Sequence, residues 1–249
     1  MRFAYHWVPA TFISRPNRFI AWFRAGEADV KAHVPNTGRL RELLVPGAEV
    51  LLSLHQEPRR KTDYELRLVK SGTAWVSIDS QLPNRIVEEG LQNGLIDDFG
   101  LVSSWRREVP YGNSRLDFRV ESDREWLVEV KGVTLQADGW SYFPDAPTER
   151  GARHVNELAE RAAQGGCAAV LFLVQHPEAR GFTPNGRMDP AFAEAVRRAQ
   201  AAGVRLVAWK CRVSPEAVEL WERIPIRLWE EAHENALPAP TRKSRERRL

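Results

Sequence analysis

A chain of 249 residues with 43% hydrophobic and 28% charged residues has the composition of a globular protein with room for two domains. It contains no apolar run of about 18 residues that could span a membrane, and its first residues lack the apolar core of a signal peptide. Its two cysteines, Cys167 and Cys211, lie inside apolar runs, which argues against a disulfide framework. We therefore expect a cytoplasmic protein that does not interact with a membrane.

The net charge of +3 is unevenly distributed along the chain. Residues 1–80 carry 12 Lys and Arg against 8 Asp and Glu, residues 81–237 carry 19 against 24, and the last 12 residues carry 5 against 1. A basic front, an acidic middle and a basic tail suit a polyanion-binding module beside a carboxylate-bearing site. Ordinary scatter of surface charge explains the same counts equally well.

The first 80 residues are rich in short segments of β-forming residues. Turn sequences such as PNTG at residues 35–38 and SG at residues 71–72 separate these segments. Strands are predicted at residues 19–24, 30–34, 49–55, 64–69 and 74–78, with one short helix at residues 40–44. About five strands and one brief helix favour a small β-barrel of the OB-fold type, and we place this domain at residues 1–81.

From Leu82 the apolar spacing becomes helical. Helices are predicted at residues 83–96, from the N-cap Thr148 to the glycines at 165–166, from Asp189-Pro190 to Gly203, and after Ser214-Pro215. Strands are predicted at residues 114–121, 126–133, 168–175 and 204–211. This order predicts an α/β (α+β) domain at residues 82–237, with helices on both faces of a mixed sheet. Residues 238–249 (PAPTRKSRERRL) are predicted to form a disordered basic tail.

The two strands at 114–121 and 126–133 carry the residues with the clearest chemical meaning. Alternation along a strand puts Glu129 and Lys131 on one face. If the intervening turn is centred on Asp123, Asp117 lies opposite Glu129 and two carboxylates share a face. A turn centred half a residue later would instead place Asp117 opposite Val130, with the carboxylates on opposite faces. The sequence leaves both registers open.

These charged residues lie among apolar neighbours, which indicates a buried strand. Buried carboxylates without a partner cost several kcal/mol, so a metal site or an ion pair is favoured. An ordinary surface pair between Glu129 and Lys131 is the alternative.

The arrangement of Asp117 with Glu129-Val130-Lys131 resembles the PD-(D/E)XK nuclease superfamily. Several longer blocks resemble the sugar fermentation stimulation protein (SfsA) family, over about residues 11–213. They are RPNRF (15–19), HVPNTGRL (33–40), SRLDF (114–118), EVKGVTL (129–135), FPDAPTERG (143–151) and His154. Leu116 stands where the superfamily's proline would be, at a position whose side chain does no chemistry.

The resemblance implies an N-terminal OB-fold, a restriction-endonuclease-like second domain, nuclease activity and DNA binding without strong sequence preference. It implies Asp117, Glu129 and Lys131 as catalytic residues, and Glu89 as an additional acidic residue on the first helix. Glu108 is a weaker candidate. Asp117, Glu129 and the Val130 carbonyl offer oxygen ligands that suit Mg²⁺ or Mn²⁺. Glu89 could equally be a solvated helix residue.

Several basic residues are candidates for nucleic-acid binding. Arg150 and His154 share a helix face and could reach a phosphate, although His154 could equally be structural. Candidate phosphate contacts in the first domain are Arg15, Arg18, Arg39, Arg59, Arg60 and Lys61. Phe19 and Trp22 are possible stacking platforms, with core packing as the more common role for such residues. Asp145 is either a helix cap or a functional acid.

Together these features predict a divalent-metal-dependent nuclease that acts on DNA, with RNA as a second substrate class. A non-catalytic DNA-binding regulator of sugar-utilisation genes is the main alternative, as the family name implies. An enzyme acting on a phosphorylated sugar lacks support, because the sequence has no glycine-rich phosphate loop. The sequence leaves the oligomeric state open, with a homodimer as one form.

Overall fold

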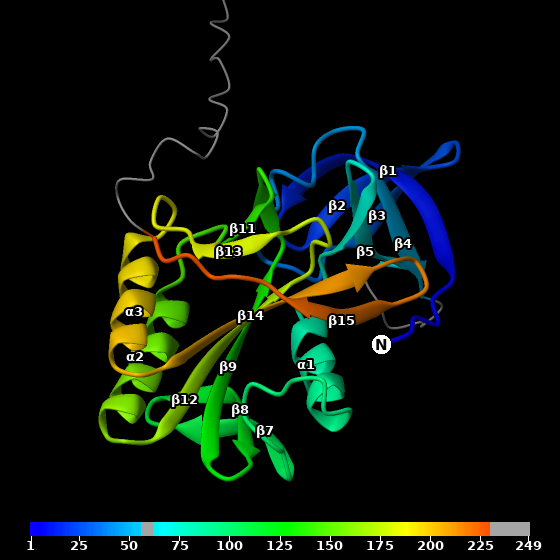
Figure 1. Cartoon of the computed structure of the whole chain (residues 1–249). Helices are drawn as coiled ribbons and strands as arrows, with labels where there is room; N and C mark the ends of the chain where they lie inside the picture. The colour runs from blue at the N-terminus through cyan, green and yellow to red at the C-terminus, as the bar shows by residue number, and fades with distance from the viewer. Residues whose placement is uncertain (56–61, 230–249) are drawn as a thin grey trace, which may run out of the picture.

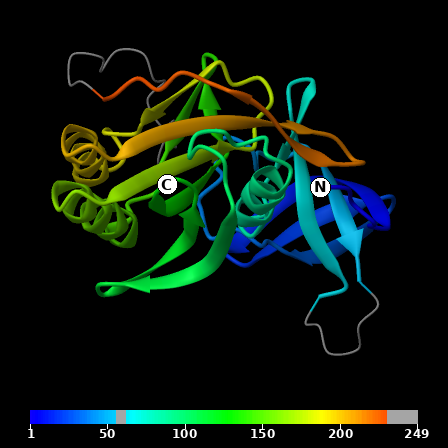
Figure 2. The same cartoon turned by 60° about the horizontal axis from the view of Figure 1, so that its bottom comes forward.

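The computed structural model describes residues 1–55 and 62–229, which form two domains lying side by side (Figure 1). The described part of the N-terminal domain contains strands and no helix. The C-terminal domain is a sheet flanked by helices, as the view in Figure 2 also shows. Two predictions fall outside the described residues: the basic run Arg59, Arg60 and Lys61, and the tail at 238–249.

The N-terminal domain is a five-stranded barrel with one further strand. Its strands are β1 (Trp7–Asn17), β2 (Ile20–Ala25), β3 (Ala28–His33), β4 (Glu49–Leu54), β5 (Tyr64–Ser71) and β6 (Ala74–Ser77). They are ordered β3-β2-β1-β4-β5-β6, and an additional pairing of β3 with β5 closes the barrel. Alternate apolar side chains, Phe12, Phe23, Leu52 and Leu66 among them, fill its interior. The predicted OB-fold is confirmed.

The C-terminal domain is built on a six-stranded mixed sheet ordered β15-β14-β12-β9-β8-β7. Its strands are β7 (Ser104–Tyr111), β8 (Ser114–Glu121), β9 (Glu125–Val133), β12 (Cys167–Val174), β14 (Arg205–Val213) and β15 (Val218–Arg223). The three central strands, β9, β12 and β14, are parallel. A separate small sheet contains β10 (Leu135–Ala137), β11 (Trp140–Phe143) and β13 (Gly181–Pro184).

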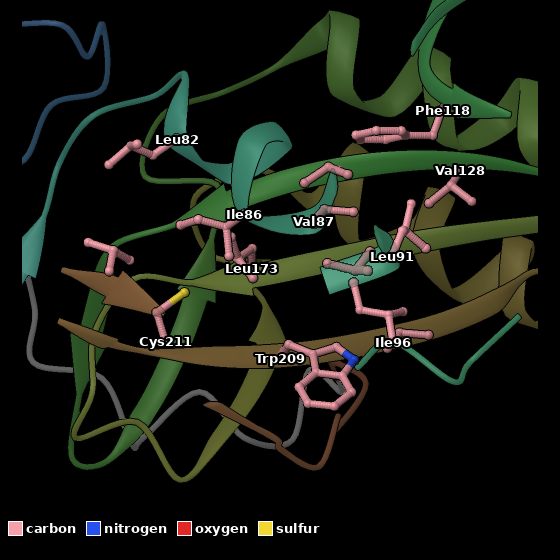
Figure 3. Close-up of a cluster of buried hydrophobic side chains, with 14 of the residues drawn as sticks. Leu82, Ile86, Val87, Leu91, Ile96, Phe118, Val128, Leu173, Trp209 and Cys211 are labelled. Atoms are coloured by element: carbon pink, nitrogen blue, oxygen red, sulfur yellow. The ribbon is translucent and has the colours of Figure 1, made fainter. Parts of the chain in front are cut away.

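Helices cover both faces of the large sheet, as predicted. On one face lies α1 (Leu82–Gln92), whose Ile86, Val87 and Leu91 pack against Val128, Leu173 and Trp209 (Figure 3). On the other face lie α2 (Glu149–Ala163) and α3 (Pro190–Ala201), which pack together (Figure 1). Burying apolar surface on both faces is what fixes the central strands in the interior.

Two predicted helices are wrong. Residues 40–44 form only one turn, closed by the Leu44 N–H donating to the Leu40 carbonyl. After Ser214-Pro215 the chain forms strand β15 instead of a helix. The Ser214 hydroxyl accepts the N–H groups of Glu216 and Ala217, which makes a tight turn, and Val218 then pairs with Val213.

Strand β1 and edge strand β7 were not predicted. β1 contains Pro9 and Pro16, and β7 is mostly exposed, with two consecutive arginines. Neither has a clear period-2 apolar pattern, which is the main sequence signal for a strand. The helix predicted at 83–96 ends earlier, since α1 stops at Gln92 and Gly94 adopts a positive φ of 65°.

The N-terminal residues connect the two domains. The Phe3 N–H donates to the Glu216 carbonyl, Arg2 forms a β-bridge with Ala217, and the Val218 N–H donates to the Met1 carbonyl. The start of the chain therefore extends the edge of the C-terminal sheet before it enters β1. Within the described residues, none of the helices is long and apolar enough to cross a membrane.

Candidate active site

The hairpin of β8 and β9 sets the position of the two carboxylates. Its turn is centred on Asp123, because Phe118 pairs with Val128 and Glu121 pairs with Glu125. This is the first of the two registers that the sequence allowed; the paired residues end at Phe118 and Val128, immediately before Asp117 and Glu129.

Asp117 lies where β8 changes course. Phe118 packs into the core beneath α1, whereas Leu116, two residues earlier, packs into the core beneath α2. Regular alternation would place both residues on the same face, so the strand rotates between them. The Asp117 carboxylate consequently reaches the backbone of β9, where its Oδ2 accepts the Val130 N–H at 2.7 Å.

The other Asp117 oxygen accepts a hydrogen bond from α1. Asn84 Nδ2 donates to Asp117 Oδ1 at 2.7 Å. Burial and the negative charge of Glu129 raise the Asp117 pKa to about 6, against the opposing effects of these hydrogen bonds and of Lys131. Val130, whose N–H binds Asp117, adjoins Glu129 in β9, so both carboxylates belong to the same part of the hairpin.

Glu129 is buried, and its carboxylate contacts two side chains, the ammonium of Lys131 and the imidazole of His154. Its Oε1 lies 2.6 Å from His154 Nδ1 on α2 and 2.5 Å from Lys131 Nζ. Burial would raise the Glu129 pKa, but the hydrogen bond from His154 and the charge of Lys131 outweigh it, so the pKa is lowered. The second oxygen, Oε2, is buried without a hydrogen-bond partner in the described structure.

The donor set fits a hard divalent cation. An orphaned carboxylate oxygen in a buried position is costly unless something binds it. Asp117, Glu129 and the Val130 carbonyl are oxygen donors at one point of the sheet. The described residues contain no group of three or more His, Cys, Asp or Glu side chains that could hold a metal. A smaller set still suits Mg²⁺, which usually keeps several waters and binds through one or two carboxylates.

Two acidic candidates lie elsewhere. Glu89 points away from the hairpin: its carboxylate is 47% exposed and forms an ion pair of 2.9 Å with the N-terminal ammonium of Met1. The α1 side chain that hydrogen-bonds Asp117 is Asn84, and a role for Glu89 in the site stays a prediction. Glu108 is exposed and pairs with Arg115.

His154 and Arg150 do share a face of α2, but they contact each other. Arg150 Nε donates to His154 Nε2 at 3.4 Å, which leaves Nδ1 of the imidazole as the donor to Glu129. His154 is 2% exposed, so it contacts the carboxylate instead of the phosphate that was predicted. Arg150 is exposed and keeps its place beside the site.

Arg15 was predicted as a phosphate contact but has a structural role. Its two terminal nitrogens donate to the carbonyls of Arg18, Asn36, Gly38 and Arg39. Burial of the Arg15 guanidinium lowers its pKa, although Asp145 opposes this effect. These hydrogen bonds connect the side chain to the loop at residues 36–39 and engage both of its terminal nitrogens.

A cleft of about 810 Å³ separates the two domains next to this loop. The barrel contributes Arg15, Arg18, Arg39 and Arg41, and the C-terminal domain contributes residues 132, 134–135, 142–148 and 175. Gly132, which follows Lys131 in β9, and Gln175 also line the cleft. Asp145 joins the two sides, since its Oδ2 accepts the N–H groups of Arg39 and Leu40 at 2.7 and 3.3 Å.

Phe19 and Trp22 remain on the surface, with exposed fractions of 51% and 40%. Phe19 lines a second cavity of about 700 Å³, together with Tyr5, Arg67 and Arg85. Both aromatic side chains therefore lie outside the barrel core.

Sequence reasoning missed Asn84, Arg41 and Gln175. Asn84 and Arg41 belong to segments where polar residues are ordinary, so no local signal distinguishes them. Gln175 did carry a signal: it follows the fully apolar strand at residues 167–174 and is itself 1% exposed. A polar residue at the carboxyl end of a buried parallel strand is typical of a binding site.

Comparison with known proteins agrees with this architecture. Residues 13–78 match the family model described as the SfsA N-terminal OB domain, and residues 81–217 match the sugar fermentation stimulation protein RE domain. A sugar fermentation stimulation protein homolog of Clostridium perfringens is 44% identical over 221 residues, covering 88% of this chain and 96% of that protein. A homolog of Caldanaerobacter subterraneus is 41% identical over 222 residues, covering 89% and 97%.

One solved structure is also similar. It is described as Pyrococcus furiosus SfsA in complex with Ca²⁺ and superposes with a TM-score of 0.82 at 30% sequence identity. The match covers 91% of this chain and 98% of that one.

Proposed function

The chain belongs to the sugar fermentation stimulation protein family, and we propose that this member is a divalent-metal-dependent nuclease that hydrolyses phosphodiester bonds in DNA or RNA. The observation that carries the proposal is the meeting of Asp117, Glu129 and Lys131 on one hairpin, with Glu129 Oε2 buried and unpartnered. This is the residue set of the PD-(D/E)XK nucleases, and it lies beside a basic cleft.

Asp117, Glu129 and the Val130 carbonyl would hold Mg²⁺ or Mn²⁺. The description of the P. furiosus relative as a Ca²⁺ complex supports a site for a hard cation in this fold, because Ca²⁺, Mg²⁺ and Mn²⁺ all prefer oxygen ligands. When bound, such an ion polarises a phosphate and lowers the pKa of water.

The chain's own residues fix the geometry of the site. His154 holds one oxygen of Glu129, and Asn84 and the Val130 N–H hold both oxygens of Asp117. Positions fixed in advance lower the reorganisation needed in the transition state. Lys131 is only 11% exposed and can donate to an attacking water or to the negative phosphate oxygens.

Nucleic acid as the substrate is supported by the arginines of the cleft. Arg18 lies between β1 and β2, Arg39 and Arg41 lie between β3 and β4, and all three line the same space. Cationic side chains of this kind bind phosphate oxygens regardless of sequence, which fits the lack of strong sequence preference expected from the family resemblance.

A cleavage assay tests the proposal. Single- and double-stranded DNA and RNA are incubated with the purified protein in Mg²⁺, Mn²⁺ or EDTA. We expect cleavage with either metal and none in EDTA, and loss of cleavage in Asp117→Asn and Lys131→Met. Binding in EDTA should persist in both variants, since affinity for a polyanion comes from distributed cations.

Lys210→Met is the matched control. Lys210 is 14% exposed and pairs with Glu222, as Lys131 is 11% exposed and pairs with Glu129, but it lies on β14 away from the hairpin. Its variant should cleave at the wild-type rate. Wild-type protein that binds DNA and cleaves nothing would identify a non-catalytic regulator instead, and undiminished cleavage by Asp117→Asn would indicate a contaminating nuclease.

A further inference from the structure

The interdomain cleft has two unlike sides. The barrel side carries the guanidinium groups of Arg18, Arg39 and Arg41. The facing side, from the C-terminal domain, is largely apolar and includes Leu135, Phe143, and the segment Ala146-Pro147. A ligand that fits both sides must be anionic along one edge and flat or apolar along the other.

Three arginines of the cleft, Arg18, Arg39 and Arg41, form no ion pair with a carboxylate of the described residues, whereas Arg15 interacts with Asp145. Exposed arginines elsewhere in the described chain are often paired, such as Arg24 with Asp29, Arg107 with Glu88 and Arg197 with Glu194. The side chains of Arg18 and Arg41 form no ion pair with any described residue, and that of Arg39 contacts only the Met188 sulfur, at 4.0 Å. Three uncompensated cations on one side of a cleft attract an anion with repeated charges.

One buried group that lines the cleft also lacks a hydrogen-bond partner within the described structure. Gln175 is 1% exposed, lines the cleft, and has no hydrogen-bond partner for its Oε1 within the described structure. A buried amide oxygen without a donor is unfavourable in the free protein, and a ligand with N–H or O–H groups relieves it. The adjacent lining residue, Gly132, follows Lys131 directly.

Asp145 joins the two sides of the cleft. The Asp145 carboxylate on the C-terminal domain accepts two backbone N–H groups of the barrel. In a duplex the bases are stacked and paired inside, so only phosphates and groove edges meet a protein. In a single strand the unpaired bases can contact apolar and aromatic side chains while the phosphates contact cations.

We propose that this cleft binds one single strand of nucleic acid, with its phosphates on Arg18, Arg39 and Arg41 and its bases against the apolar side. The strand would pass Gln175 and lead its backbone to Lys131. This inference rests on the proposed nuclease function and names its substrate class: a single strand, or a single-stranded end of a duplex.

Binding measured in EDTA tests the proposal separately from cleavage. Fluorescent oligo(dT), oligo(U) and a blunt hairpin duplex of equal length are titrated with the full chain over a salt series. Arg18→Ser/Arg41→Ser should weaken single-strand binding at least about tenfold and reduce the salt slope by about 1.4, since each phosphate contact on a single strand contributes about 0.7. The control is Arg197→Ser/Arg198→Ser on α3, which changes the net charge equally and should leave both values unchanged.

Preference for either single strand over the duplex, lost in the cleft variant alone, supports the inference even if no cleavage is found. Equal affinity for the duplex overturns it, and so does an equal loss in the two arginine variants, even if the protein proves to be a nuclease. Comparison of oligo(dT) with oligo(U) then shows whether the cleft prefers DNA or RNA.

Discussion

Asp117 and Glu129 lie on adjacent strands, yet their pKa values shift in opposite directions. Both are removed from water, which favours the neutral acid. Glu129 is in contact with Lys131 and His154, and both residues lower its pKa. Asp117 receives hydrogen bonds from neutral donors only and faces the Glu129 charge, so its pKa rises to about 6. Asp117 is therefore the residue whose charge a bound cation would stabilise most.

The first prediction concerns stability without metal. The folded-state pKa of Asp117 is raised from 3.8 to about 6, so its ionisation destabilises the folded state as pH rises between these values. A shift of two pKa units corresponds to a loss of about 2.7 kcal/mol in the free energy of unfolding. Asp117→Asn avoids this loss but gives up one accepted hydrogen bond, which costs about 1 kcal/mol. In EDTA near neutral pH the variant should unfold at higher denaturant concentration than the wild type.

The advantage of Asp117→Asn should vanish below about pH 4, where the wild-type carboxyl is protonated in both states. Added Mn²⁺ should stabilise the wild type and leave the variant unchanged, by mass action on the folded state. Denaturation curves at several pH values with and without Mn²⁺ measure both effects. An unchanged wild-type curve in Mn²⁺ would argue against a metal site at Asp117.

The second prediction concerns His154, which positions Glu129. His154→Leu removes the donor to Glu129 Oε1 and should weaken Mn²⁺ binding about 10- to 100-fold, as expected for a residue that orients a ligand. His154→Asn keeps an N–H close to the position of Nδ1 and should recover part of this loss. Calorimetric titration with Mn²⁺ measures the affinities. Equal affinities in the two variants would reduce His154 to a packing role.

At the scale of secondary structure, α1 lies very close to β9 at one point. A Cβ added at Gly132 would lie 2.7 Å from Cγ of Pro83, in the first turn of the helix. Glycine therefore allows the start of α1 to approach the strand that carries Glu129 and Lys131. The next residue of the helix is Asn84, which binds Asp117. The approach of helix and strand thus sets the geometry of the carboxylates.

The third prediction tests this contact. Gly132→Ala should destabilise the protein by about 1–3 kcal/mol, because neither the helix nor the strand can move freely within a packed core. Pro83→Ala removes the ring atom that the new methyl group would meet, so the double variant should be more stable than the sum of the two single effects. Denaturant unfolding of the four proteins measures the coupling. Strict additivity would mean that the ring and the glycine do not contact each other.

For the whole molecule, the contact through Asp145 decides the shape of the cleft. A single carboxylate on the loop after β11 accepts the Arg39 and Leu40 N–H groups of the other domain. The N-terminal residues form a second link, through their pairing with β15. Barrel residues Leu51 and Leu68 also pack into the core cluster of the C-terminal domain, so these contacts together hold the domains in one arrangement.

The fourth prediction concerns Asp145→Ala. Removing the carboxylate leaves two backbone donors without their acceptor and should lower the free energy of unfolding by about 1–3 kcal/mol. Affinity for oligo(dT) in EDTA should fall as the sides of the cleft separate. Asp29→Ala is the control, because its exposed pair with Arg24 contributes little to stability. Identical stability and affinity in the two variants would mean that Asp145 does not hold the domains.

The sequence by itself determined the barrel, the mixed sheet and the hairpin that carries Asp117, Glu129 and Lys131. Apolar periodicity and turn residues act over a few positions, and they are read directly from the chain. The sequence did not determine the edge strands β7 and β15. These strands depend on pairing with β8 and β14, and their own residues are only weak signals for a strand.

Only the tertiary structure decided which polar side chains meet at the site. The hairpin register was open until the pairing of β8 with β9 chose it. Asn84 reaches Asp117 across 33 positions of sequence, and Asp145 reaches Arg39 across 106. Glu89, one helical turn and a residue beyond Asn84, points to the chain's own N-terminus instead. Such contacts follow from how helices and domains pack on the sheet, and no local pattern encodes the direction in which a polar side chain will find its partner.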